Sequence, residues 1–151
     1  MLKMNSKMLD LYRKSALCEI ALSGELAEIA SSGFKELDGC LFVSKLIDYG
    51  SSATIYDFPD RTGYECFINS VNTDDYVDNH HLGYGVSFVR KIFNCWHDAK
   101  RKQILVAMLL VGEFGVKVKL HVQRGTEQWL ADDLESYEEP ILVVDSLESE
   151  F

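Results

Sequence analysis

The chain has no apolar run long enough to cross a bilayer, because the longest, Ile104 to Gly112, falls well short of the roughly 20 residues required. Its first residues, MLKMNSKMLDLYRKSAL, lack the uninterrupted apolar core of a secretory signal. No internal repeat and no low-complexity linker occurs. These absences argue against a membrane partner and predict a cytoplasmic protein.

Cysteine-pairing and zinc-finger motifs are also missing. Cys18, Cys40, Cys66 and Cys95 form no CxxC pair, and no histidine lies near them at finger spacing. Each lies among apolar neighbours, as buried free thiols usually do. We therefore predict four reduced core cysteines, with a disulfide pair or a four-thiolate zinc site as the alternatives.

Lys and Arg are absent from the last 26 residues, Thr126 to Phe151, although the 35 residues before them, Arg90 to Arg124, carry eight. A concentrated negative field speeds the encounter with a positively charged partner and repels nucleic acid. With a net charge of −9, the chain is predicted to bind a basic protein rather than nucleic acid. The same 26 residues carry nine carboxylates: Glu127, Asp132, Asp133, Glu135, Glu138, Glu139, Asp145, Glu148 and Glu150.

A length of 151 residues, 47% of them hydrophobic and 26% charged, predicts one globular domain over residues 1–151, with an acidic tail from about residue 145. Apolar spacing is most regular in two places: helical from Val86 to Trp96, and alternating from Val116 to Gln123. We predict an α+β domain with a mostly antiparallel sheet, helices packed on it and the order α-β-β-β-α-β-β-α-β. The predicted helices are 5–23 (capped by Asn5 or Ser6, with a further turn at 25–30), 86–96 and 127–137, and the predicted strands are 41–47, 53–56, 64–71, 103–111, 116–123 and 141–144, with a hairpin loop at 112–115.

The polar segment Asp74 to His81, DDYVDNHH, is the strongest candidate for chemistry. Carboxylates and imidazoles are ligands for divalent metals, and His80 with Asp78 or Asp75 could supply two or three of them. Adjacent residues rarely bind one metal together, and no HExxH or EF-hand spacing is present. A solvated loop that leads into a helix cap is therefore the main interpretation.

Other catalytic patterns are weak. Cys95 and His97 lie two residues apart on a predicted helix and so point in different directions. His121 lies on the polar side of the alternating strand, where an exposed histidine is expected. Gly83-Tyr84-Gly85 resembles a phosphate-binding turn but lacks a third glycine and a following lysine. We expect no enzymatic activity and no cofactor.

The acidic C-terminal cluster has three interpretations. It can bind a partner, it can form the solvated face of a short helix, or it can neutralise Lys100 to Lys102 or Lys117 and Lys119 within the fold. Exposed aromatic side chains beside the acids would favour binding, and Tyr137 and Phe151 are the candidates. The predicted partner-binding residues are Asp132, Asp133, Glu135, Glu138, Glu139, Tyr137, Asp74, Asp75 and Asp78.

The acidic segment WLADDLESYEEPILVVDS, Trp129 to Ser146, and the DDYVDNHH loop give the chain an overall character that resembles the immunity proteins of contact-dependent growth inhibition and related polymorphic toxin systems. The resemblance implies tight, stoichiometric blocking of a cognate toxin domain, commonly a basic nuclease, in the cytoplasm. The alternatives are a metal- or small-ligand-dependent enzyme that uses the Asp74–His81 loop, and an adaptor or oligomeric structural protein.

Overall fold

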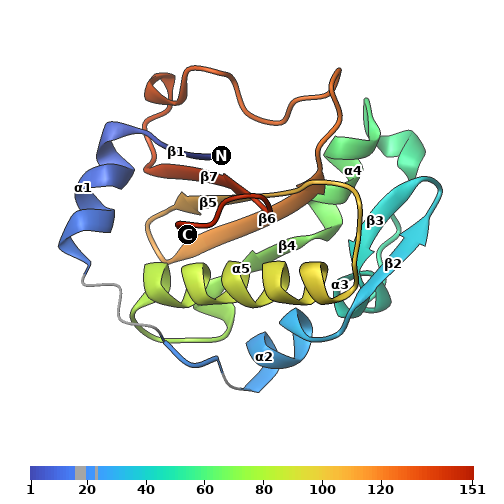
Figure 1. Ribbon diagram of the computed structural model, residues 1–151, viewed down its shortest axis with the longest axis horizontal. Coiled ribbons are helices and arrows are strands. Elements are labelled where there is room, and N and C mark those ends of the chain that lie inside the picture. Colours follow the sequence, from blue (N-terminus) through green and yellow to red (C-terminus); the bar gives the residue numbers. More distant parts are fainter. Residues whose placement is uncertain (16–19, 23) are drawn as a thin grey trace.

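The computed structural model describes residues 1–15, 20–22 and 24–151 and confirms an α+β fold with a mostly antiparallel sheet. The main sheet has five strands in the order β1-β7-β5-β6-β4, and each neighbouring pair is antiparallel (Figure 1). A separate hairpin pairs two further strands. The strands are β1 (Leu2–Met4), β2 (Phe34–Leu37), β3 (Cys40–Val43), β4 (Ser70–Asn72), β5 (Leu105–Val111), β6 (Val116–Val122) and β7 (Ile141–Asp145).

One long helix covers one face of the main sheet. It runs across β5 and β6 and begins earlier than the predicted residue 86 (Figure 1). Its buried stripe includes Val89, Phe93 and Trp96, as the helical spacing predicts. The helices are α1 (Ser6–Lys14), α2 (Gly24–Ala30), α3 (Ser44–Asp48), α4 (Arg61–Ile68) and α5 (His81–Asp98), with 3-10 turns η1 (Ile55–Asp57), η2 (Thr73–Asp75) and η3 (Leu134–Ser136).

The β5–β6 hairpin and β7 confirm the predicted second half of the sheet. Alternate residues of β6, from Val116 to Val122, are buried toward α5, so Lys117, Lys119 and His121 project from the opposite face. That second face is crossed by the segment between β6 and β7 (Figure 1), and Lys119 on it donates to the carbonyl of Cys66 in α4 at 3.0 Å. Residues 123–140 are called the strap below.

Several predicted elements are wrong. Residues 64–71 form the end of α4 and then β4, not one strand, and residues 53–56 give way to the turn η1. The predicted strand 41–47 ends at Val43, where α3 begins. The predicted helix 127–137 is an irregular strap with only η3 in it, and β1 and β2 were not predicted. Helix α1 is capped by Asn5 as predicted but ends at Lys14, and the rest of that predicted helix includes residues 16–19 and 23, outside the described part, as is Cys18.

A fully buried carboxylate explains why 61–68 is a helix. Glu65 accepts hydrogen bonds from the backbone of Leu41 on β3 (2.6 Å) and Val122 on β6 (3.0 Å). Its two oxygens also accept from both terminal nitrogens of Arg124, at 2.7 and 2.8 Å. A bidentate pair with two further backbone donors satisfies a buried charge. Glu65 therefore joins the small hairpin to the main sheet.

Asn69 repeats this connection one helical turn later. Its amide oxygen accepts from the backbone of Val43 (2.8 Å), and its nitrogen donates to the carbonyls of Leu41 (2.9 Å) and Leu120 (3.3 Å). Residues four apart lie on the same side of a helix, so both polar side chains reach the gap between β3 and β6. We call Glu65, Asn69 and Arg124 the polar bridge.

Candidate functional site

The strap, which carries most of the predicted binding residues, is fixed by one buried side chain. Asn5 donates to the carbonyls of Leu134 (3.2 Å) and Glu139 (2.7 Å) and accepts from the backbone of Ile141 (3.0 Å). The same oxygen caps α1 by accepting from Met8 at 3.0 Å. Because every polar atom of the amide is used, Asn5 ties the acidic half of the strap to the start of α1.

Three of the predicted strap acids are engaged within the fold. Asp132 accepts from the side chain of Gln128 (2.8 Å), and Asp133 caps η3 by accepting from the backbone of Glu135 (3.1 Å). The carboxylate of Glu135 lies at the N-terminus of α1 and accepts from the backbone (2.5 Å) and hydroxyl (2.8 Å) of Ser6. An acid at a helix N-terminus compensates the helix dipole, so these residues have local structural roles.

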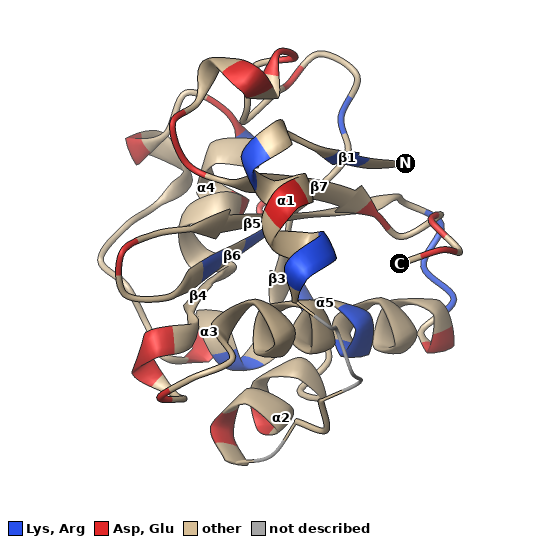
Figure 2. Ribbon diagram, turned by 90° about the vertical axis from the view of Figure 1, so that its left-hand side faces the viewer, with Lys and Arg blue, Asp and Glu red and all other residues tan. Residues whose placement is uncertain are grey.

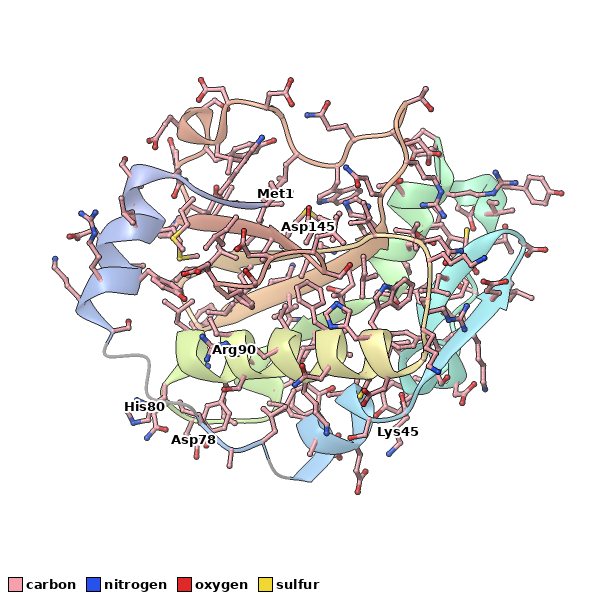
Figure 3. All side chains as sticks on the ribbon, in the orientation of Figure 1. Met1, Lys45, Asp78, His80, Arg90 and Asp145 are labelled. Atoms are coloured by element: carbon pink, nitrogen blue, oxygen red, sulfur yellow. The ribbon has the colours of Figure 1, made fainter. Side chains whose placement is uncertain are left out.

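Acids near the ends of the 26-residue stretch are paired as well. Asp145 and Glu148 lie 3.0 and 3.3 Å from the amino group of Met1, and Figure 3 shows Met1 beside Asp145. Glu127 accepts from the backbone of Thr62 at 3.0 Å. The carboxylates left open to a partner are therefore fewer than the sequence indicates.

Two parts of the chain that carry predicted residues meet at the tip of the β5–β6 hairpin. Asp74 from η2, Glu113 from the hairpin loop and Glu139 from the strap line one hollow of about 440 Å³. Lys117 lines it too, so the three acids outnumber the one cation. Figure 2 shows acidic segments along this edge of the molecule, from the strap past the hairpin to the loop before α5. We call this feature the hairpin hollow.

An exposed aromatic side chain accompanies the acids of the hairpin hollow. Phe114 lines the hollow at the hairpin tip and is 74% exposed. The two aromatics predicted for this role are placed otherwise: Tyr137 is half-buried and its hydroxyl accepts from the backbone of Ala131 (2.9 Å), whereas Phe151 packs against Phe93. Phe114 was not among the predicted binding residues, although its place in the predicted hairpin loop at 112–115 indicates an exposed side chain.

The Asp74–His81 loop does not gather its polar side chains. Asp75, Asp78 and His80 are exposed, and Figure 3 shows Asp78 and His80 at the periphery. The ring of His81 instead bonds the hydroxyl of Thr73 at 2.8 Å, fixing the start of α5 against η2. In the described ranges, no three His, Cys, Asp or Glu side chains are grouped so as to hold a metal ion.

Internal neutralisation by the acidic cluster is not observed. Within residues 1–15, 20–22 and 24–151, no ion pair joins a strap acid to Lys100 to Lys102, Lys117 or Lys119. Arg101 pairs with Glu36 at 2.9 Å instead. Lys119 lies under the strap, where its ammonium is 5.5 Å from the ring centre of Trp129 and burial lowers its pKa.

The thiols and the strand histidine are placed as follows. Cys40 and Cys66 are buried free thiols, as predicted, and Cys95 is a free thiol of intermediate burial.

His121, expected on the surface, is buried at 7% exposure because the strap covers its side of the sheet, and this burial lowers its pKa. The prediction of an exposed His121 was wrong because the alternation of apolar and polar residues along β6 does not show which segment covers the polar side of the strand.

Fold and site together define an α+β domain in which a helix covers one face of an antiparallel sheet and an acidic strap crosses the other. The chain belongs to the Uncharacterized protein PM0498 family, whose profile matches residues 3–151. No curated protein and no solved structure matches the chain. Among the helices of the described residues, none has both the length and the apolarity needed to span a membrane.

Proposed function

We propose that the protein is an immunity-type inhibitor in the cytoplasm that binds a basic toxin domain and blocks it stoichiometrically, without a reaction or cofactor of its own. The observation that carries the proposal is the hairpin hollow, which Asp74, Glu113 and Glu139 line together with the exposed side chain of Phe114. Acidic groups steer a cationic partner, and a desolvated aromatic anchor supplies much of an interface's binding energy.

The charge of the whole chain supports the same mechanism. With a net charge of −9, the protein attracts a cationic surface from a distance, and a nuclease cleft is cationic because it binds a polyanion. The remaining exposed acids of the strap and loop, Glu138, Asp75 and Asp78, extend the negative field around the hollow.

The first test is neutralisation of toxicity. The protein is co-expressed with the C-terminal toxin domain encoded beside its gene, and growth is measured. We expect growth to be restored, and purified components to form a complex of one copy each. Absence of such a gene, or growth arrest despite expression of both proteins, contradicts the proposal.

The second test assigns the surface. The double variant Asp74→Lys and Glu139→Lys changes the charge by the same amount as the control Asp98→Lys and Glu150→Lys, two exposed acids that do not line the hollow. We expect the first pair to slow association at low salt by at least about tenfold and the control pair to have a much smaller effect. Equal effects of the two pairs would remove the hollow from the interface.

A further inference from the structure

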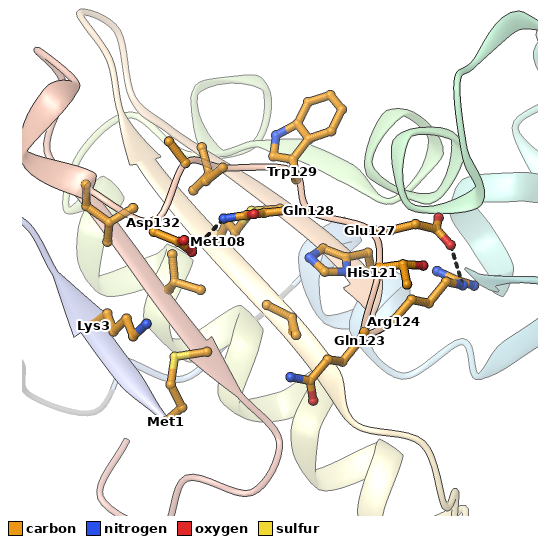
Figure 4. Close-up of a pocket in the computed structure, with 17 residues that line it drawn as sticks. Met1, Lys3, Met108, His121, Gln123, Arg124, Glu127, Gln128, Trp129 and Asp132 are labelled. Atoms are coloured by element: carbon orange, nitrogen blue, oxygen red, sulfur yellow. Dashed lines mark hydrogen bonds and ion pairs between the residues drawn. The ribbon is translucent and has the colours of Figure 1, made fainter.

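A second cavity lies between the strap and the face of the main sheet opposite α5, away from the hairpin hollow. Its volume is about 370 Å³, near the lower end of small-molecule sites. Figure 4 shows β-strands below it and the strap above it. Part of the floor is apolar and comes from Val106 and Met108 on β5 and Val143 on β7. Charged side chains line the cavity as well: Lys3, Arg124, Glu127 and Asp132.

The roof of the cavity is anchored mainly at its two ends. Glu127 accepts from Thr62 at one end, and the carbonyl of Leu134 accepts from Asn5 at the other. Between these points, Gln128 bonds Asp132 and the backbone of Ala131 bonds Tyr137 within the strap. The ring of Trp129 also contacts the sheet there, with the ammonium of Lys119 5.5 Å from its centre. Trp129, 41% exposed, forms part of this roof.

A buried imidazole forms part of the wall. His121 is 7% exposed, lines the cavity and bonds the carbonyl of Val122 through Nδ1 at 2.9 Å (Figure 4). A carbonyl oxygen only accepts, so Nδ1 carries the proton, and in the neutral ring Nε2 keeps a free lone pair. In the described part of the chain, Nε2 has no hydrogen-bond partner.

We propose that this cavity binds a small planar aromatic or heteroaromatic molecule that donates an N–H or O–H hydrogen bond to Nε2 of His121. The apolar floor and the indole of Trp129 suit a flat ring. Nε2 of His121 favours a ligand ring that carries an N–H or O–H donor. A ligand that displaces water from the cavity without donating a hydrogen bond would leave Nε2 unpaired, which is costly. Burial lowers the pKa of His121 and so favours the neutral ring, in which Nε2 is an acceptor.

The test compares two probes of the same shape, indole and benzofuran, which differ in having a ring N–H donor or a ring oxygen. Binding to the full chain is followed by NMR with ¹⁵N-labelled histidine. We expect indole to bind about tenfold more tightly than benzofuran and to move the Nε2 resonance of His121 in the direction of an accepted hydrogen bond. The variant His121→Phe keeps a ring of similar size and should make the two affinities equal.

The wild-type comparison decides the question even if the variant does not fold. Equal affinities for indole and benzofuran would overturn the proposal by showing an unselective apolar cavity. Two other results would also overturn the proposal: binding of indole without a shift of the Nε2 resonance of His121, and no binding of indole at millimolar concentration. None of these results bears on the toxin test, because the cavity and the hairpin hollow share no lining residue.

Discussion

Removal of the Glu65 side chain is expected to be among the most damaging single substitutions in the chain. The Glu65→Ala variant leaves the backbone N–H groups of Leu41 and Val122 without their acceptor and leaves Arg124 half-buried without its carboxylate. An unsatisfied buried donor costs about 1–3 kcal/mol, and breaking a buried ion pair costs about 3–5 kcal/mol. These losses overlap, so we expect the free energy of unfolding to fall by about 4 kcal/mol.

The assay is urea unfolding followed by circular dichroism, with thermal unfolding as a second measurement. For a domain of this length, each kcal/mol shifts the midpoint temperature by about 2–4 °C, so the expected decrease is roughly 8–16 °C. If α4 and the β2–β3 hairpin unfold at a lower urea concentration than the main sheet, the polar bridge is what holds this hairpin to the main sheet.

The matched control is the exposed pair Glu36–Arg101, whose atoms lie 2.9 Å apart, close to the 2.7 Å of Glu65–Arg124. Glu36 is 59% exposed whereas Glu65 is fully buried, so Glu36→Ala should cost less than about 1 kcal/mol. A cost below about 1 kcal/mol for Glu65→Ala as well would contradict this prediction, because it attributes the cost to the burial of the pair and not to the distance between its charged atoms.

Four further predictions concern buried groups. Asn5→Ala should lower the free energy of unfolding by about 2–4 kcal/mol and speed amide hydrogen exchange in the strap, because a helix cap and three further bonds are lost; unchanged exchange would contradict this. Burial raises the pKa of Cys40 to about 11 and of Cys66 to about 12, so both should resist iodoacetamide at pH 8 until the protein unfolds, as checked by mass spectrometry. Because these folded-state pKa values exceed the ordinary 9.0, stability should fall as the pH rises from 9.0 towards about 12, and this loss should be smaller if Cys40 and Cys66 are replaced by Ala. Gly85→Ala should cost about 1–3 kcal/mol by calorimetry, because a Cβ there would lie 3.2–3.3 Å from side chains of β5 and β6, and an unchanged melting temperature would show that the helix can shift freely.

The sequence predicts correctly those elements that bury a single side against the rest of the protein, because their apolar residues then repeat with the period of a helix or a strand. Helix α5 has an apolar stripe facing a single sheet, and β6 alternates between a buried and a polar side. The α4 segment misleads because Tyr64, Cys66 and Ile68 alternate as in a strand. The helix is fixed instead by Glu65 and Asn69, whose partners on β3 and β6 are distant in sequence.

The candidate site is predictable in composition but not in arrangement. The sequence contains the acids, yet whether Asp74 meets Glu139 depends on strand order, which brings η2, the hairpin and the strap to one edge. The roles of Glu135 and Asp133 as caps also depend on a strap that is not helical. Burial of His121 likewise requires knowledge of what crosses the second face.

The position of β7 in the sheet bears on how the chain is made on the ribosome. β7 lies between β1 and β5, so Leu2 to Met4 are synthesised about 140 residues before the strand with which they pair. Until then β5, with the sequence LVAMLLV, is paired on one side only. An apolar strand with an open edge is prone to intermolecular pairing, and non-local strand pairing is slow. We therefore expect the nascent chain to expose the edge of β5 until β7 has been synthesised, and a chain that ends before residue 141 to aggregate more readily than the full chain.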